Sequence, residues 1–380
     1  MLDEPHRAVE AMVRRFAEER IRPIAGELDA SERFPAELYR EMAGLGLLGL
    51  TVPAELGGAG LDHLGYAIVM EELARGYASV ADQVGLVELV ATLLVEQGTE
   101  AQRARYLGPL LAAARHPAYA ITEAEAGSDV AAIATRAVRT ERGWRLEGAK
   151  LWIHNAPVCD FAVVLARTDP EAGKRGMSIF LVDADRPGFV RGRAEHKMGQ
   201  RASPLGELRF DGVELPPDAL LGPEGRGFHL MMSVLDKGRV GIAALSVGIA
   251  RAGLEAALAH VRTRRQFGRP IGDHQGVRWM LADMAKDIQA ARLLVHDAAR
   301  RLDRGERATL ACSMAKCFAS DVAVKATRDA VQLFGGSGYV RGFEVERLYR
   351  DAKVCQIYEG TNQIQREIIA RELFAAAGDR

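Results

Sequence analysis

The chain has 380 residues, which at about 150 residues per domain predicts two or three domains and a core large enough to be stable without a disulfide or a bound metal. Its 50 lysine and arginine residues nearly balance its 51 aspartate and glutamate residues, and this net charge of −1 disfavours a nucleic-acid partner, which calls for a basic surplus. Four scattered cysteines, an acidic amino terminus and the lack of about 18 consecutive apolar residues predict a cytoplasmic protein without a disulfide scaffold, a targeting peptide or a membrane span.

Helical periodicity dominates residues 1–118, which we predict to form a helical N-terminal domain. The segments Asp62–Arg75 and Val80–Gln97 each predict one helix, and the second is almost wholly apolar and therefore buried. Gly44–Gly49 spells G-x-G-x-x-G, but a dinucleotide fingerprint needs a strand before the glycines and a helix after them. A helix precedes these glycines and Pro53 soon follows, so helix termination is the favoured interpretation.

We predict that residues 119–226 form a central antiparallel β-domain, because the spacing between apolar residues becomes shorter than in a helix. Alternating or short apolar runs occur at Trp144–Glu147, Phe161–Leu165, Met177–Val182 and Leu208–Asp211. Glycine, proline and aspartate punctuate these runs, as in a meandering sheet.

Helical spacing returns in residues 227–380. The predicted helices are Phe228–Val261, Val277–Leu302, Ala308–Phe334 and Ile364–Phe374. Long helices with short connections predict an antiparallel C-terminal bundle. No H-E-x-x-H, clustered Cys/His or G-x-S-x-G pattern occurs, so neither a metal site nor a serine hydrolase is expected.

Three glycine- or arginine-rich segments each allow two interpretations. Gly127–Asp129 can offer hydroxyls and amides to a polar ring or a phosphate, or it can be an interdomain turn. Arg264–Gly268 joins two guanidinium groups to an aromatic ring, which suits a nucleotide but also a solvated helix end. Gln332–Gly338 can approach a pyrophosphate or simply end a helix.

Glu359 precedes a predicted helix start and also allows two interpretations. Asn362, with Gln365 three residues later, resembles a capping arrangement. A carboxylate near a helix N-terminus is favoured by the helix dipole, so Glu359 is either such a charge or a catalytic acid.

The order and spacing of these segments resemble the acyl-CoA dehydrogenase family over nearly the whole chain. The segments that carry the resemblance are Pro53–Gly60, Thr122–Glu123, Gly127–Asp129, Lys150–Ile153, Gly222–Phe228, Asp236–Arg239, Arg264–Gly268, Gln332–Gly336 and Tyr358–Gln363. The resemblance implies a helical N-terminal domain, a central β-domain and a C-terminal four-helix bundle, in agreement with the periodicity.

The resemblance implies FAD, held non-covalently in a homotetramer. Residues that match positions around the flavin are Tyr119, Ile121, Thr122, Ser128, Trp152, His154, Thr361 and Gln363. Residues that match positions reaching the FAD of a neighbouring subunit are Arg264, Phe267, Gln275, Gln332 and Gly336. Such a shared site would make assembly a condition of cofactor binding.

The resemblance further implies α,β-dehydrogenation of an acyl-CoA to the trans-2-enoyl thioester, with hydride transfer to flavin N5. Glu359 matches the catalytic base, and the position used by some relatives instead is Gly238, which cannot serve. Matches to acyl-CoA contacts are Ser128, Asp236, Arg239, Tyr358 and Gly360. The expected electron acceptor is an electron-transferring flavoprotein, in fatty acid metabolism.

His154 departs from the family, in which many members have Thr or Ser donating a hydroxyl near flavin N5. The imidazole either replaces that donor or points away from the ring. The alternatives to a dehydrogenase are an oxygen-using enzyme of the same fold, an oxidase or a flavin monooxygenase, and a non-catalytic helical binding protein. Glu88 is either a surface residue or the polar end of a pocket.

Overall fold

The computed structural model describes residues 2–378 and arranges them as helices, a sheet and helices in chain order. Its N-terminal helices are α1 (Glu4–Phe16), α2 (Ala25–Ser31), α3 (Ala36–Gly44), α4 (His63–Gly76), α5 (Ala78–Gln97), α6 (Glu100–Gln102) and α7 (Gly108–Leu111). The two helices predicted from the apolar period are α4 and α5. α3 ends at the glycines of the G-x-G-x-x-G pattern, where Gly46 and Gly49 have positive φ, so helix termination is confirmed there.

Two helices are apolar enough by length and composition to cross a membrane. They are α5 and the first helix of the C-terminal region, α8 (Gly227–Thr263). Inside this fold, 94% of the most apolar window of α5 and 67% of that of α8 are buried by protein.

The central sheet has the order β6-β7-β3-β2-β4-β5-β8, with β1 beside β4. Its strands are β1 (Pro117–Ala120), β2 (Arg136–Thr140), β3 (Gly143–His154), β4 (Phe161–Arg167), β5 (Met177–Asp183), β6 (Phe189–Arg191), β7 (Leu205–Leu215) and β8 (Leu220–Leu221). The expectation of an antiparallel sheet is wrong for β4, which pairs in parallel with β1 and, at one position, with β2. A parallel pair needs a long crossover, and the chain from β1 to β4 runs through β2 and β3.

The sequences of β4 and β5 are nearly continuous apolar runs, because protein covers both faces of the sheet at these strands. In β4, Phe161, Val163 and Leu165 join the main core formed by the helices. The alternate residues Ala162 and Val164 belong to a second core on the other face of the sheet. The helices and the sheet therefore share one continuous core, which fixes the sheet against α5 and α8.

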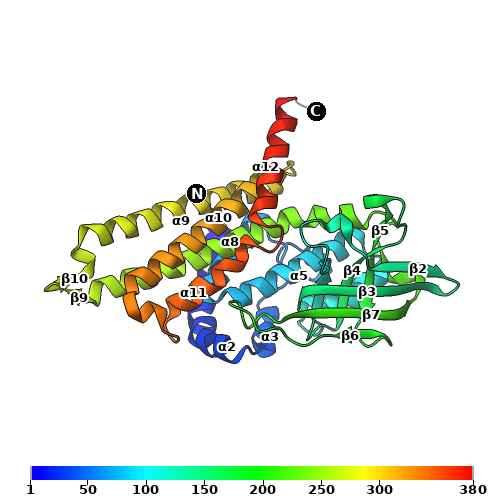
Figure 1. Ribbon diagram of the computed structural model, residues 1–380, viewed down its shortest axis with the longest axis horizontal. Coiled ribbons are helices and arrows are strands. Elements are labelled where there is room, and N and C mark those ends of the chain that lie inside the picture. Colours follow the sequence, from blue (N-terminus) through cyan, green and yellow to red (C-terminus); the bar gives the residue numbers. More distant parts are fainter. Residues whose placement is uncertain (1, 379–380) are drawn as a thin grey trace.

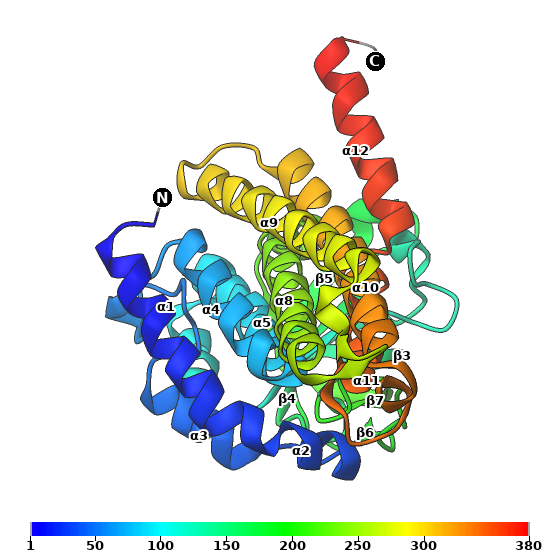
Figure 2. The same ribbon diagram turned by 90° about the vertical axis from the view of Figure 1, so that its left-hand side faces the viewer.

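The C-terminal helices form the predicted bundle beside that core (Figure 1). They are α8, α9 (Gln275–Asp303), α10 (Thr309–Phe334), α11 (Glu344–Lys353) and α12 (Asn362–Ala377), and the hairpin β9–β10 (Arg265–Gln266 and Arg269–Pro270) joins α8 to α9. The hairpin lies at the end of the molecule farthest from the sheet, whereas α12 stands out from the body (Figures 1 and 2). The helical bundle and the central sheet confirm the predicted fold class.

α8 packs closely on α4 at Gly248, and a substitution there tests this packing. A Cβ at this position would lie 2.3 Å from the backbone oxygen of Glu71, which cannot move without shifting α4. We expect Gly248→Ala to lower the free energy of unfolding by about 1–3 kcal/mol in a denaturant titration. Gly253→Ala is the matched control on the same helix, because its Cβ would meet nothing closer than 3.5 Å. An equal loss in both variants would contradict this packing.

Candidate active site

Glu359 lies in a short loop whose backbone is held in an unusual conformation. Glu359 has φ of +52° and Gly360 has φ of +90°. The left-handed region costs a non-glycine residue about 1–2 kcal/mol, so other contacts must hold it. Gln365 Nε2 donates to the carbonyl oxygens of Glu359 (3.1 Å) and Gly360 (3.0 Å), and Lys316 Nζ donates to that of Gly360 (2.8 Å). The direction of the Glu359 side chain is therefore fixed by its backbone.

The capping arrangement expected at Asn362 is wrong, because Thr361 caps α12. The Thr361 hydroxyl accepts from the amide of Ile364 at 3.3 Å. Asn362 is buried between α10 and α12, where its amide group donates to Ser320 Oγ at 2.9 Å and accepts from Lys316 Nζ at 3.1 Å. A buried amide is retained where each of its polar atoms finds a partner, and Asn362 meets that condition.

The Glu359 carboxyl group is largely buried and has an unpaired oxygen. Among residues 2–378, Glu359 Oε2 finds no hydrogen-bond partner. Burial raises the pKa of Glu359 to about 7 and the charge of Asp82 adds to the rise, while Lys316 and Arg239 oppose it. A carboxyl group with a free oxygen and a pKa near neutrality can accept a proton from a bound molecule.

Gly238 of α8 faces this carboxyl group. A Cβ at Gly238 would lie 2.2 Å from Glu359 Oε2 and 3.0 Å from Leu89. The absence of a side chain at Gly238 thus leaves room for the carboxyl group that arrives from the loop before α12. The space next to α8 holds either a side chain from position 238 or that of Glu359.

Asp236 and Arg239 form a partly buried pair one turn apart on α8. Arg239 Nη1 lies 2.5 Å from Asp236 Oδ1, and the Thr309 hydroxyl donates to Asp236 Oδ2 at 2.7 Å. Arg239 is only 7% exposed, and its Nε has no partner within the described part of the chain. The positive charge of this guanidinium lowers the pKa of Glu359 and so opposes the effect of burial.

β1 and β3 supply the sheet side of the site. The Leu151 amide donates to the Thr122 oxygen at 2.9 Å, which brings the segment after β1 against Trp152 in β3. Trp152 has φ of +57° and is 55% exposed, so its side chain is open to solvent rather than packed in the core. Ile121 is buried, while Ser128 lies exposed in the loop that follows.

The two tyrosines that the family resemblance places at the site make hydrogen bonds to other parts of the fold. The partly buried Tyr119 donates its hydroxyl hydrogen to the Met231 oxygen at 3.1 Å. Tyr358 precedes Glu359, and its hydroxyl accepts from Gln200 Nε2 at 3.3 Å. Burial keeps the pKa of both phenols well above its ordinary value.

His154, at the end of β3, has both ring nitrogens next to protein groups. Its Nε2 lies 2.7 Å from Ser203 Oγ, and its Nδ1 lies 3.4 Å from Asp82 Oδ2. The Ser203 hydroxyl donates to the same Asp82 oxygen at 2.8 Å. Burial lowers the pKa of His154, and the charge of Asp82 partly offsets that effect.

The remaining residues that the family resemblance assigns to FAD form two groups at different ends of the bundle. Thr361 and the exposed Gln363 lie beside Glu359 at the start of α12. A second group lies near the hairpin β9–β10 and consists of Arg264, Phe267, Gln275, Gln332 and Gly336. There the end of α10 contacts the end of α8, because Phe334 stacks on His260 with ring centroids 4.1 Å apart. Arg264 is 25 residues beyond Arg239, which along a helix is about 38 Å. One chain therefore does not bring the two groups together.

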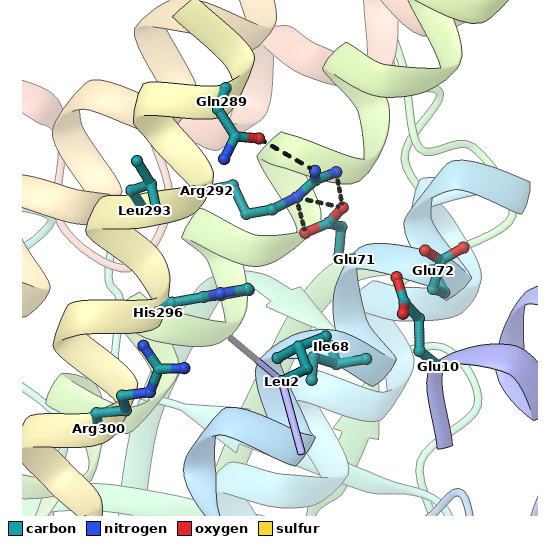
Figure 3. A pocket seen from close by; sticks show the side chains of 10 residues that line it. All are labelled: Leu2, Glu10, Ile68, Glu71, Glu72, Gln289, Arg292, Leu293, His296 and Arg300. Atoms are coloured by element: carbon teal, nitrogen blue, oxygen red, sulfur yellow. Dashed lines mark hydrogen bonds and ion pairs between the residues drawn. The ribbon is translucent and has the colours of Figure 1, made fainter. Parts of the chain in front are cut away.

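A cavity of about 280 Å³ lies elsewhere, between α1, α4 and α9 (Figure 3). Glu71 in its wall accepts from Arg292 and Arg251, so these charges are already paired. Burial lowers the pKa of His296, also in the wall, to about 4. Among residues 2–378, no group of three or more His, Cys, Asp or Glu side chains is placed to hold a metal ion.

Sequence reasoning missed three residues of the site. Asp82 and Lys316 are charges within long, buried, mostly apolar helices, and that contrast is a signal that could have drawn attention to them. Ser203 lies in a loop and carries no such signal. Glu88, also in α5, is buried and accepts from the amides of Leu50 (2.8 Å) and Thr51 (3.0 Å), so it ties a loop to the helix.

Comparisons with known proteins match this chain from end to end. The family models described as acyl-CoA dehydrogenase N-terminal, middle and C-terminal domains match residues 3–114, 118–213 and 225–374. A probable acyl-CoA dehydrogenase, FadE25, of Mycobacterium tuberculosis is 44% identical over 374 residues, which cover 98% of this chain and 96% of the relative.

Solved structures of the same fold also match nearly the whole chain. Butyryl-CoA dehydrogenase from Megasphaera elsdenii superposes with a TM-score of 0.95 at 38% identity, over 98% of this chain and 99% of that one. A chain described as electron transferring flavoprotein of Acidaminococcus fermentans has a TM-score of 0.96 at 41% identity, covering 98% of each chain. PigA in complex with FAD has a TM-score of 0.94 at 29% identity, also covering 98% of each.

The pKa of Glu359 predicts how stability depends on pH. Its value of about 7 in the folded protein exceeds its ordinary 4.5, so folding becomes less favourable as the pH rises through this range and the carboxylate forms. We expect Glu359→Gln to be more stable than the wild type by on the order of 2–3 kcal/mol above pH 7, with no difference below pH 4.5. Thermal unfolding across pH measures this difference. Glu367→Gln, at an exposed position in α12, is the control and should give no such divergence.

Proposed function

The chain belongs to the acyl-CoA dehydrogenase family and is an oxidoreductase acting on acyl-CoA, and on this basis we propose that Glu359 is its catalytic base. The reaction is the removal of a proton from the α-carbon and a hydride from the β-carbon of the acyl-CoA, giving the trans-2-enoyl thioester. The observation that carries the assignment is the buried, unpartnered Oε2 of Glu359. A base must have a free oxygen to take the proton, and most buried carboxylates do not.

The α-proton of a thioester is weakly acidic, so its removal also needs stabilisation of the carbonyl oxygen. The backbone amide of Glu359 has no acceptor among the described residues, and it lies next to the carboxyl group that takes the proton. An amide held in this way can donate to the developing oxyanion without rearranging. The left-handed backbone at Glu359 thus positions both the base and this donor.

The residues around Glu359 fit FAD, which the family uses and which supplies the acceptor for the hydride. The exposed ring of Trp152 offers an apolar face to a planar ring, and Thr122 is hydrogen-bonded through its backbone to the adjacent Leu151. Thr361 and Gln363 lie at the first turn of α12, where a helix N-terminus favours polar or anionic groups. Asp236, Arg239 and Gly360 lie on the Glu359 side, where we place the acyl-CoA together with Ser128 and Tyr358.

We also propose that a second copy of the chain completes each cofactor site. Arg264 and Phe267 are exposed, Phe267 by 92%. Arg264, just past the end of α8, lies about 38 Å along the helix axis from Arg239. α12 stands out from the body and exposes Leu373 and Phe374 at its end (Figure 2). Both features favour assembly, and the homotetramer of the sequence prediction remains the proposal. An electron-transferring flavoprotein is the proposed electron acceptor, in the cytoplasm.

Flavin bleaching tests the base. We expect the purified protein to be yellow and to be bleached by an acyl-CoA under anaerobic conditions, and Glu359→Gln to slow the bleaching by about 100-fold or more while keeping its FAD. Glu367→Gln, which makes the same chemical change at an exposed site eight residues on, should bleach at the wild-type rate. Normal bleaching of Glu359→Gln would show that Glu359 is not the base, and a panel of acyl-CoAs would reveal the preferred chain length.

Retention of FAD tests the shared site. We expect Arg264→Gln to weaken FAD binding by about tenfold or more, since one charged hydrogen bond is worth roughly that factor. Equilibrium dialysis of the folded oligomer measures the affinity. Arg262→Gln, two residues away and also exposed, is the control. Equal FAD affinity in the wild type and both variants would place Arg264 outside the cofactor site.

A further inference from the structure

We propose that Tyr66 of α4 sets the length of the acyl group: its hydroxyl is what the far end of the chain meets, so the site takes straight acyl groups of about four to six carbons. This inference rests on the proposed role of Glu359 and names the class of acyl-CoA that the same site accepts. It is carried by the close approach of Glu359 and Tyr66 to two glycines of α8.

Gly238 and Gly241 lie one turn apart on the same side of α8. A glycine inside a helix weakens the helix, so each of them calls for a reason in the packing. A Cβ at Gly238 would lie 2.2 Å from Glu359 Oε2, and a Cβ at Gly241 would lie 2.0 Å from the hydroxyl oxygen of Tyr66. Both positions are therefore kept free of a side chain for a group that arrives from another part of the fold.

These two contacts limit the distance between the base and the phenol. Cβ positions three residues apart on a helix are about 5–6 Å apart, so the Tyr66 hydroxyl oxygen lies within about 10 Å of Glu359 Oε2. The α-carbon that gives up its proton must come within about 3 Å of that carboxylate oxygen. The last methyl group must stay about 3.5–4 Å from the hydroxyl oxygen.

The remaining length holds a short chain. An extended chain with C–C bonds of about 1.5 Å advances about 1.3 Å per carbon, so two to four carbons fit beyond the α-carbon. Together with the α-carbon and the thioester carbon, they make an acyl group of about four to six carbons.

The surroundings of the two glycines leave Tyr66 as the group that the chain meets. Toward the N-terminus of α8, the next residues on this side are Val234 and Met231, which are fully buried and fill the space with their own side chains. Gly85 of α5 also lies beside the phenol, since a Cβ there would be 3.8 Å from the hydroxyl oxygen. α4, α5 and α8 thus meet at Tyr66.

The Tyr66 hydroxyl is a neutral end for the chain. Tyr66 is 1% exposed, and burial raises its pKa well above the ordinary value, while the charges of Glu88 and Glu359 add to the rise. The phenol therefore stays protonated. A methyl group can pack against it, whereas a second carboxylate at the end of the chain would lose its water to surroundings whose charges are also negative.

Flavin bleaching by straight-chain substrates from butyryl-CoA to dodecanoyl-CoA tests the assignment in the FAD-loaded oligomer. We expect the bleaching rate per unit concentration to fall by about tenfold or more from hexanoyl-CoA to octanoyl-CoA, because two methylene groups find no room beside Tyr66. Tyr66→Ala should raise the octanoyl-to-hexanoyl ratio by about tenfold or more, since the chain can then extend past Gly241. Tyr66→Phe removes only the oxygen and should raise the ratio by about fourfold, the worth of one buried methylene.

Tyr39→Ala is the matched control, because Tyr39 of α3 is also a fully buried tyrosine. It should lower the melting temperature, as Tyr66→Ala does, and leave the ratio unchanged. Equal rates with hexanoyl-CoA and octanoyl-CoA in the wild type, or an unchanged ratio in the Tyr66 variants, would overturn the inference. Should Tyr66→Ala not fold, Tyr66→Phe carries the test.

Binding without chemistry separates this inference from the proposed base. Titration of FAD-loaded Glu359→Gln with the same acyl-CoAs, followed by the flavin absorption spectrum, measures affinity alone and should show the same limit between hexanoyl-CoA and octanoyl-CoA. Affinity that keeps rising with chain length would contradict the role of Tyr66. Normal bleaching by Glu359→Gln would instead refute the proposed base, so the two failures are distinguishable.

Discussion

Burying one carboxylate oxygen, Glu359 Oε2, without a hydrogen-bond partner is the constraint on which this site depends. An unpaired buried oxygen costs on the order of 1–3 kcal/mol, and the left-handed backbone of Glu359 adds to that cost. Contacts around Glu359 offset this cost by holding its loop and the neighbouring helices in place. Lys316 and Gln365 hold the loop, Asn362 joins α10 to α12, and Gly238 leaves room for the carboxyl group. The unpaired oxygen is the feature on which the proposed role of Glu359 as a base rests.

The sheet and the bundle serve this site through their shared core. β4 and β5 bury both faces, so the sheet cannot slide relative to α5 and α8 without exposing apolar side chains. Trp152 and His154 in β3 are thereby fixed relative to Glu359 in the loop before α12. Lys150, wholly buried and paired with Glu123 at 2.7 Å, ties β3 to the segment after β1 in the same way.

Sequence alone predicted the three regions, the long helices and the strands, because strong apolar periods reflect local geometry. It did not predict α11, whose ten residues are mostly charged and bury only one narrow face, or the parallel pairing of β1 with β4, which depends on distant contacts. At the site, Glu359 could be singled out by its motif. Its raised pKa, the network of Asp82, Ser203 and His154, and the role of Asn362 depend on side chains that meet only after folding.

α8 fixes the geometry of two cofactor sites at once if its two ends serve different copies of the chain. Its 37 residues are one continuous helix, with Arg239 toward one end and Arg264 just past the other. Inserting a single residue between them would move one end by about 1.5 Å and turn it by about 100° relative to the other. The length of α8 is then under stricter selection than the identity of its outward side chains, and substitutions should accumulate there while insertions and deletions do not.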